Sequence, residues 1–359
     1  MTRSHPHPSR PSQGGIPEIP SRSRGKGARF ARSSGSAARL LLASLGLLLG
    51  CTDEGAGGTP GEASGDARPT LEARFDAARA WTRLETIVGF GARYSGSAAN
   101  GRLRDWLVSE LEALGLEPVR EPFTDRTPIG AIDFENVYAD LPASTAEGAD
   151  APLLVLVSHF DTKRLRVPFE GANDSGSSTA VLLELARVLS SDDAVRRTPI
   201  RFLFVDGEEA VRADWIGDDN TYGSRHHVAR AFEDGTLQRM GAAVVLDMVG
   251  DANLRLTTDL ASDPRLLRLF FDSARSLGLG AHVGGPAQEI GDDHVPFLDA
   301  GVPAVDLIDF EYGPENAYWH TRDDDLTNCS QDSLEHIGRI VLHALPALED
   351  FVLGGAEAR

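Results

Sequence analysis

The sequence predicts an α/β protein, a three-layer sandwich in which a mixed, mostly parallel central sheet is flanked by helices. Two observations predict this fold. Four short, nearly continuous apolar runs lie at residues 153–157, 200–205, 242–246 and 304–308, and such runs are typical of strands that are covered on both faces. Segments with helical spacing of apolar residues alternate with these runs, and this alternation favours a largely parallel sheet.

The helices are predicted from the recurrence of apolar residues every three or four positions. Helical spacing is found at residues 71–88, 101–114, 177–189, 223–232, 264–277, 294–300 and 330–353. Gly115 marks the end of the second of these segments, and the last is a long amphipathic helix. Residues 117–123 and 133–141 are expected to add an antiparallel edge to the sheet.

Charge is distributed unevenly along the 359 residues, whose net charge is −19. Residues 1–50 hold eight basic residues and one acidic residue, so the rest of the chain carries a net charge of −26. A body this acidic repels phosphate backbones, which argues against nucleic acid as a partner. The 41% hydrophobic and 25% charged residues are ordinary for a globular protein and exclude a mostly disordered one.

The N-terminal segment is predicted to be an export signal. A basic leader precedes a ten-residue apolar run at 40–49, which is too short to span a bilayer and is followed by Gly50 and Cys51. This pattern resembles a bacterial lipoprotein signal, cleaved so that Cys51 receives a lipid. We therefore expect a signal peptide at 1–50, a flexible tether at 51–70 and one folded domain at 71–359. The protein would be anchored in the cell envelope at the periplasm or outer membrane.

Acidic residues and imidazoles follow the predicted central strands. Because ligands of open α/β sheets bind beyond the carboxyl ends of the strands, we expect these side chains to converge in one cleft. They are His159, Asp174, Glu208, Glu209, Asp247 and His320.

Two imidazoles and several carboxylates form a ligand set that suits zinc. The only cysteines are Cys51 and Cys329, so a thiolate zinc cluster is excluded. In the pair Glu208 and Glu209, one carboxylate can bind the metal while its neighbour carries a proton. A lone Glu pair is usually solvated and a lone His is usually structural, but their joint occurrence at four strand ends favours a metal site.

A further acidic cluster, Asp292-Asp293-His294, begins a predicted helix. Asp293 fits the role of a helix N-cap, whose side chain satisfies free backbone N–H groups. Crowding Asp292 against Asp247 would be costly unless the two carboxyl groups share a proton, which is common at catalytic sites.

These motifs resemble the animal-type glutaminyl-peptide cyclotransferases, or glutaminyl cyclases, within the zinc-aminopeptidase superfamily. The resemblance covers roughly residues 75–351. It is carried by residues 158–163, 171–175, 183–187, 206–210, 222–226, 292–298, 301–303 and 319–321. The resemblance implies a zinc-exopeptidase-like fold and the conversion of N-terminal glutamine of peptides or proteins to pyroglutamate, with release of ammonia.

The resemblance also implies roles for individual residues. The implied ligands of one zinc ion are Asp174, Glu209 and His320. Glu208 would be the general base, and Asp247 and Asp292 would form the hydrogen-bonded acid pair. A second zinc ion, as in the dinuclear aminopeptidases of the superfamily, would use His159 and Asp247 in addition.

For the substrate pocket, the resemblance points to Trp215, Trp319 and Lys163. The sequence departs from the animal enzymes at several positions. Asp306 stands where they have a histidine, and no cysteine pair lies near the metal. Two alternatives remain open, a secreted dinuclear-zinc aminopeptidase and a non-catalytic binding module. We expect a monomer that meets the membrane only through its lipid.

Overall fold

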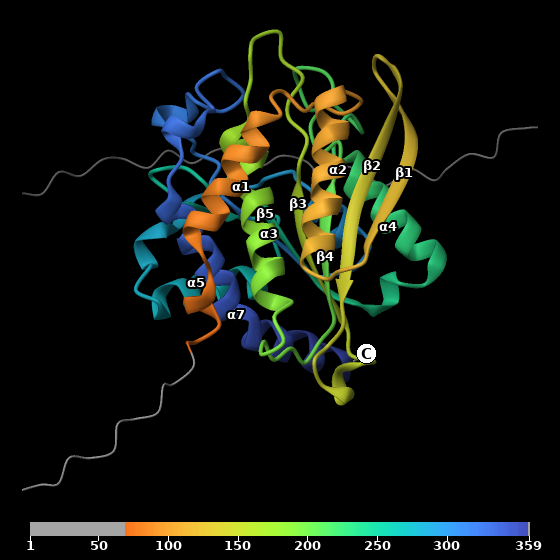
Figure 1. The fold of residues 1–359 in the computed structure, drawn as a ribbon, viewed down its shortest axis with the longest axis vertical. Coiled ribbons are helices and arrows are strands. Elements are labelled where there is room, and N and C mark those ends of the chain that lie inside the picture. Colours follow the sequence, from red (N-terminus) through yellow and green to blue (C-terminus); the bar gives the residue numbers. More distant parts are fainter. Residues whose placement is uncertain (1–68, 358–359) are drawn as a thin grey trace, which may run out of the picture. The chain divides into compact units, whose positions relative to one another are not determined.

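The computed structural model describes residues 69–357, and its centre is a six-stranded mixed sheet (Figure 1). The strands are β1 (Pro118–Thr127), β2 (Gly130–Leu141), β3 (Leu153–His159), β4 (Ile200–Val205), β5 (Met240–Asp247) and β8 (Ala304–Ile308). They lie in the order β1-β2-β4-β3-β5-β8. The pairs β4–β3, β3–β5 and β5–β8 are parallel, whereas β1–β2 and β2–β4 are antiparallel. The predicted mixed, mostly parallel sheet with an antiparallel edge is confirmed.

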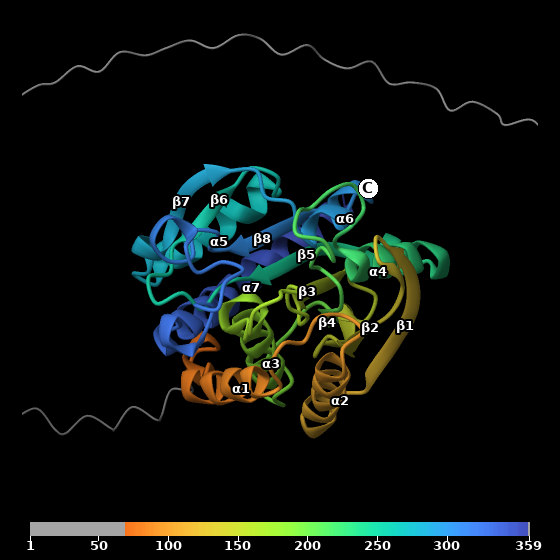
Figure 2. The same ribbon diagram turned by 90° about the horizontal axis from the view of Figure 1, so that it is seen from above.

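Helices cover both faces of this sheet (Figure 2). They are α1 (Ala77–Gly89), α2 (Ala98–Ala113), α3 (Ser178–Leu189), α4 (Tyr222–Asp234), α5 (Pro264–Ser276), α6 (His294–Asp299) and α7 (Gln331–Glu357). Helices α1, α2, α3, α5 and α7 pack on one face, while α4 and α6 contribute to a separate core on the other. Single helical turns lie at Glu72–Arg74, Ala146–Gly148, Ala172–Ser177, Leu237–Arg239, Gly280–His282, Pro314–Asn316 and Leu326–Asn328.

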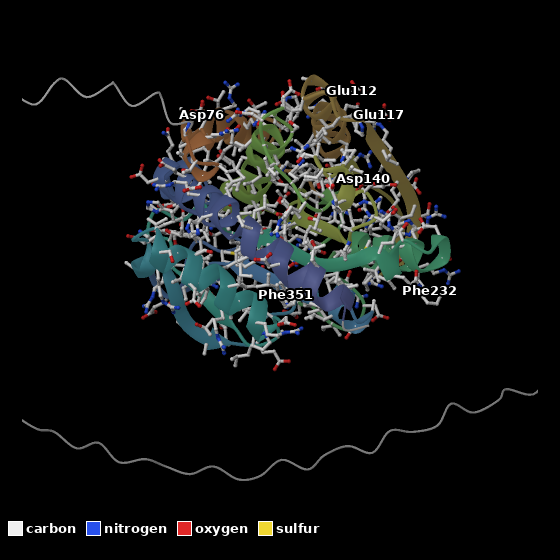
Figure 3. All side chains as sticks on the ribbon, turned by 90° about the horizontal axis from the view of Figure 1, so that it is seen from below. Asp76, Glu112, Glu117, Asp140, Phe232 and Phe351 are labelled. Atoms are coloured by element: carbon white, nitrogen blue, oxygen red, sulfur yellow. The ribbon has the colours of Figure 1, made fainter. Side chains whose placement is uncertain are left out.

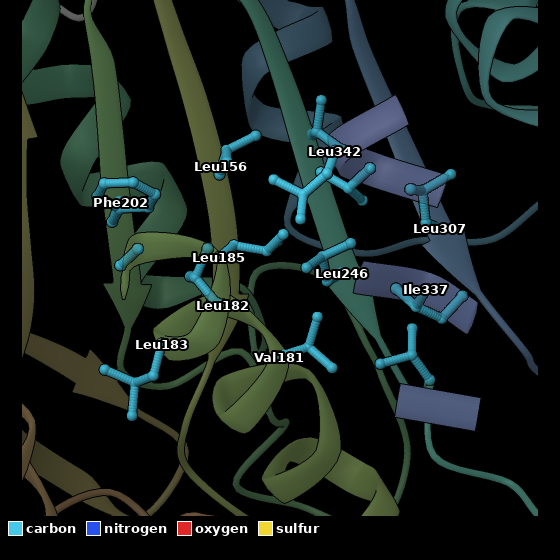
Figure 4. Close-up of a cluster of buried hydrophobic side chains, with 14 of the residues drawn as sticks. Leu156, Val181, Leu182, Leu183, Leu185, Phe202, Leu246, Leu307, Ile337 and Leu342 are labelled. Atoms are coloured by element: carbon cyan, nitrogen blue, oxygen red, sulfur yellow. The ribbon is translucent and has the colours of Figure 1, made fainter. Parts of the chain in front are cut away.

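Successive side chains of a strand point to opposite faces of the sheet, so the core forms two layers, one on each face. In β3, Leu154 and Leu156 belong to the larger cluster, whereas Val155 and Val157 belong to the cluster under α4 and α6. Figure 4 shows Leu156 among side chains from α3, β4, β5 and α7. Burying each such side chain contributes about 1.5–3 kcal/mol, so the apolar runs specify the strands at the centre of the sheet.

Side-chain caps explain where several helices begin. The Asp76 carboxylate accepts a hydrogen bond from the Arg79 backbone N–H at the start of α1, and Ser97 caps α2 through the N–H of Asn100. Asp263 caps α5, where Pro264 occupies the first turn. Such caps satisfy backbone donors that have no partner within the helix.

The structure adds elements that the sequence did not predict. Strands β6 (Leu256–Asp259) and β7 (Val283–Gln288) form a second, two-stranded parallel sheet. Strand β6 has four residues, and β7 contains two glycines and a proline, so neither shows an apolar run of the usual length. Strand β1 also extends beyond its predicted end to Thr127, because its ladder with β2 continues through polar residues.

The surface carries many of the acids that make the chain negative. Asp76, Glu112, Glu117 and Asp140, which are labelled in Figure 3, are all exposed. The predicted signal peptide, most of the tether and Cys51 lie outside the described residues. Among residues 69–357, no helix has the length and apolar character needed to cross a membrane.

Candidate active site

The carboxyl ends of the central strands bring the predicted residues together. His159 is the last residue of β3 and Asp247 is the last residue of β5. Glu208 and Glu209 follow β4 after a turn at Gly207, whose φ of +79° lies in the left-handed region that favours glycine. His320 lies in the loop after β8, with a φ of +55° that is uncommon for any residue with a side chain.

Asp174 lies between the two imidazoles. Its Oδ1 is 3.3 Å from Nε2 of His159, and its Oδ2 is 3.3 Å from Nε2 of His320. His159 also lies 3.1 Å from Oδ1 of Asp247, and Nε2 of His320 lies 2.9 Å from Oε1 of Glu209. The Asp174 carboxylate therefore belongs to two adjoining clusters of donor atoms. The first cluster is Asp174, Glu209 and His320, and the second is His159, Asp174 and Asp247.

Two buried side chains that the sequence analysis did not identify hold the segment that carries Asp174. The Arg93 guanidinium donates hydrogen bonds to the backbone oxygens of Phe160, Glu170 and Gly171. The Asp324 carboxylate accepts hydrogen bonds from the backbone N–H groups of Asn173 (2.7 Å) and Asp174 (3.2 Å). Asp324 was detectable only as an acid four residues after His320, and nothing in the sequence around Arg93 indicated its role.

In both clusters, the nearby carboxylates favour the protonated, positively charged form of the imidazole. Burial by itself would lower the pKa of His159, but the carboxylates of Asp247 and Glu208 outweigh it and hold that pKa well above its ordinary value. For His320, burial is likewise outweighed, by Glu209 and Asp174, and the pKa rises to about 10. Burial would raise the pKa of Asp174, yet the two imidazoles hold it well below its usual range.

Glu208 lies next to the clusters without joining either of them. Its Oε2 is 3.7 Å from Nδ1 of His159, and its backbone N–H donates a hydrogen bond to Oδ1 of Asp161. Burial, together with the nearby charges of Asp292 and Glu209, raises the pKa of Glu208 well above its ordinary value. A buried carboxyl group with a raised pKa can exchange a proton near neutral pH.

Lys163 contacts Glu209. Its Nζ is 3.3 Å from Oε2 of Glu209, and its side chain is buried. It is not among the residues that line the pocket described below. This placement gives Lys163 a contact with Glu209, in contrast to the direct substrate contact that the resemblance implied.

Asp292 belongs to a third cluster of titratable side chains, and it also lies near Asp247. Donor atoms of Asp292, His294 and Asp306 lie within 4.8 Å of one another, and Oδ1 of Asp292 accepts a hydrogen bond from the backbone N–H of Asp293. Burial, and for Asp306 the charges of Asp292 and Asp247, raise the pKa of the carboxyl groups of Asp292 and Asp306. The proximity of Asp292 also raises the pKa of Asp247, which burial brings to about 7. Asp247 and Asp292, the acid pair that the resemblance implies, therefore lie near enough for the charge of Asp292 to affect the pKa of Asp247, and a proton shared between them stays a prediction.

Asp293, the neighbour of Asp292, occupies the N-cap position of α6, as predicted. Its side chain makes no capping hydrogen bond there. Instead, its Oδ1 accepts a hydrogen bond from the hydroxyl group of Ser224 in α4. Asp293 therefore ties the two helices on this face of the sheet to each other.

A pocket of about 380 Å³ opens over these residues. Its lining includes Asp174, Glu208, Glu209, Asp247, Asp292 and His320. Both Trp215 and Trp319 line it as well, together with the apolar side chains of Ile290 and Phe310. The Trp319 ring stacks on the His320 imidazole, with centroids 4.0 Å apart. The pocket therefore joins a polar floor to aromatic walls, as small-molecule sites usually do.

Comparison with known proteins identifies the family. A model of peptidase family M28 matches residues 136–345. The glutaminyl-peptide cyclotransferase-like protein of Bos taurus is 31% identical over 282 residues, which cover 69% of this chain and 70% of that protein. The glutaminyl-peptide cyclotransferase of Drosophila melanogaster is 29% identical, with coverage of 74% and 79%.

Solved structures agree with this assignment. The glutaminyl cyclase of an Acidobacteriales bacterium superposes with a TM-score of 0.73 at 30% identity, over 81% of this chain and 99% of that one. A leucine aminopeptidase precursor from Bacteroides thetaiotaomicron, at 22% identity and a TM-score of 0.67, shares the fold. The chain belongs to peptidase family M28. Within that family it is similar to the glutaminyl-peptide cyclotransferases, which confirms the resemblance found in the motifs.

The residues present fit a zinc ion. The donor atoms of Asp174, Glu209 and His320 lie within 4.8 Å of one another, and two carboxylates with one imidazole are a ligand set that zinc accepts. Oε2 of Glu209 is buried and has no hydrogen-bond partner. A divalent cation would supply the positive charge that these carboxylates otherwise draw from protonated imidazoles.

Proposed function

We propose that this protein is a zinc-dependent glutaminyl-peptide cyclotransferase, which converts the N-terminal glutamine of peptides or proteins to pyroglutamate and releases ammonia. The observation that carries the proposal is that Glu208 and Asp292, two buried acids with raised pKa values, line the same pocket as Asp174, Glu209 and His320. The similarity to glutaminyl-peptide cyclotransferases over most of the chain supports it.

In this reaction the α-amine of the substrate attacks the carbon of its own γ-amide. A C–N bond forms, the bond to the amide nitrogen breaks, and that nitrogen leaves as ammonia. Zinc held by Asp174, Glu209 and His320 would polarise the γ-carbonyl group. Glu208 accepts a proton from the attacking amine and returns it to the leaving nitrogen. Asp292, with the proton it shares, holds that nitrogen.

The pocket would also fold the substrate side chain into a compact shape and exclude water. Since amine and amide belong to one molecule, the remaining entropic barrier is the folding of a flexible side chain into a five-membered ring. The walls formed by Trp215 and Trp319 favour this compact shape and exclude water from the amide carbon. Excluding water matters because hydrolysis of the side-chain amide would compete with cyclisation.

A specific observation supports a second candidate, a dinuclear-zinc aminopeptidase. His159, Asp174 and Asp247 form a second cluster of donor atoms that shares Asp174 with the first. Two metal ions could therefore bind side by side. The buried acid Asp292 and the two tryptophans Trp215 and Trp319 in the pocket lining favour the cyclotransferase, since a protonated acid there would serve a leaving ammonia.

One assay separates the two candidates. Purified protein is given a Gln-peptide and a Leu-peptide, and release of ammonia and of free leucine is measured in parallel. A cyclotransferase releases ammonia from the first and leaves the second intact. Release of leucine without ammonia would establish the aminopeptidase, and neither product would contradict both proposals.

We also propose that the protein is an exported bacterial lipoprotein, attached to the cell envelope through a lipid on Cys51. The basic leader, short apolar run and following cysteine support this. Mass spectrometry of the mature N-terminus should find a lipidated Cys51, whereas an intact leader would refute the proposal.

A further inference from the structure

The mouth of the pocket carries acidic side chains of its own. Asp214, in the loop between β4 and α4, and Glu289, between β7 and α6, both line the pocket and are exposed. The carboxylates near the floor, such as Glu209 and Asp292, are buried. The two exposed acids, called the rim acids here, therefore lie between the reacting groups and solvent.

The lining of the pocket is predominantly acidic in composition. Seven of its residues are acidic, and His320 is its only basic one; the described lining contains no lysine or arginine. Neither rim acid forms an ion pair among the described side chains. A concave site lined by one sign of charge concentrates ligands of the opposite sign.

The position of the rim acids determines which part of a substrate they meet. If the N-terminal glutamine occupies the floor, the following residue must lie at the mouth, because the peptide can leave only through the opening. We propose that Asp214 and Glu289 make the enzyme selective for peptides in which a lysine or arginine follows the N-terminal glutamine. This inference rests on the proposed function and names the substrate class of the same site.

The expected preference for a basic second residue is modest, and it depends on the salt concentration. Exposed charge pairs contribute modestly, so two rim acids should favour a Gln-Lys peptide over a Gln-Glu peptide by about threefold to tenfold in kcat/KM. The preference should shrink in about 0.5 M salt, since the screening length is then only a few ångströms. The α-amine is common to all the peptides, so it does not contribute to the ratio.

The test measures ammonia release from three peptides that differ only at the second position, Gln-Lys, Gln-Ala and Gln-Glu. It compares the wild-type chain with the double variant Asp214→Asn and Glu289→Gln. The control is Asp218→Asn with Glu147→Gln. Asp218 is an exposed acid of the same β4–α4 loop that does not line the pocket, and Glu147 lies in the turn before β3.

The proposal predicts a Lys-over-Glu preference in the wild type and in the control, and its loss in the rim variant, with Gln-Ala turnover little changed. Equal rates for the three peptides in the wild type would overturn it while leaving cyclisation intact. A preference that persists in the rim variant would also overturn it, because the charge responsible would then lie elsewhere. Failure to cyclise all three peptides would instead remove the proposed function and this inference with it.

Discussion

Glu208 and Glu209 show how one residue's surroundings decide its chemistry. They are neighbours in the sequence, yet Glu209 contacts His320 and Lys163, whereas Glu208 faces Nδ1 of His159 at 3.7 Å. Glu209 lies among the donor atoms of the first cluster, so it suits a metal ion. A carboxyl group in a buried, acidic neighbourhood has a raised pKa and suits proton transfer.

This division of roles predicts the behaviour of Glu208→Gln. The glutamine has nearly the same shape but cannot accept a proton, so ammonia release should fall by about 100-fold or more. Bound zinc, measured by elemental analysis, should stay at the wild-type level because Glu208 is outside the ligand cluster. Glu112→Gln on the exposed face of α2 is the control, and a wild-type rate for Glu208→Gln would remove its assignment as the base.

Asp292 is the second residue whose replacement should stop the reaction. Asp292→Ala removes one member of the proposed acid pair with Asp247, and the rate of cyclisation should fall by about 100-fold while zinc content stays constant. Asp299→Ala, at an exposed position at the end of the following helix α6, should leave the rate unchanged. An unaffected rate in Asp292→Ala would show that the leaving nitrogen is held by another group.

At the scale of elements, Asp324 couples two segments that are distant in the sequence. Its carboxylate accepts hydrogen bonds from the backbone of Asn173 and Asp174, and His320 precedes it by four residues in the same loop. Asp324 thereby holds the loop of one zinc ligand against the segment of another. Burial and the proximity of Asp174 raise its own pKa to about 8.

The variant Asp324→Asn tests this coupling. An asparagine presents one N–H₂ group where two backbone N–H groups need acceptors, so the loops should separate and the affinity for zinc should fall by about tenfold to 100-fold. Competition with a chelator measures that affinity. Asp323→Asn, an exposed neighbour, is the matched control, and equal zinc affinity in both variants would contradict the role of Asp324.

The elements that could be predicted from the sequence are those whose signal is local. Strand β4 has the predicted bounds because its six residues are all buried and all but Arg201 are apolar. Strand β7 was missed because Gly284, Gly285 and Pro286 interrupt any such run.

The residues of the site also divide into those that the sequence predicts and those that it does not. Residues at strand ends, such as His159 and Asp247, could be found because the topology of a parallel sheet places them together. Asp306 could not be linked to Asp292 and His294, because it lies inside an apolar run in β8 and the other two residues belong to a segment before it. The role of Asp324 depends on hydrogen bonds to backbone groups about 150 residues away, which no sequence pattern records.

At the scale of the whole molecule, the sheet gathers an unusual amount of negative charge at one edge. The pocket lining alone holds seven acids, in a chain whose net charge is −19. Such a concentration is stable only if protons or a cation offset it. Metal binding and proton sharing would therefore both offset this negative charge, and both take part in the proposed reaction.

The most direct test of this account is a zinc titration of the metal-free protein while ammonia release from a Gln-peptide is recorded. We expect no release in the presence of chelator, and a rate that rises in proportion to added zinc and levels off at one equivalent. A rate that levels off only at two equivalents would assign the second cluster, His159, Asp174 and Asp247, to the working enzyme. Full ammonia release from protein shown to be free of metal would contradict the central claim.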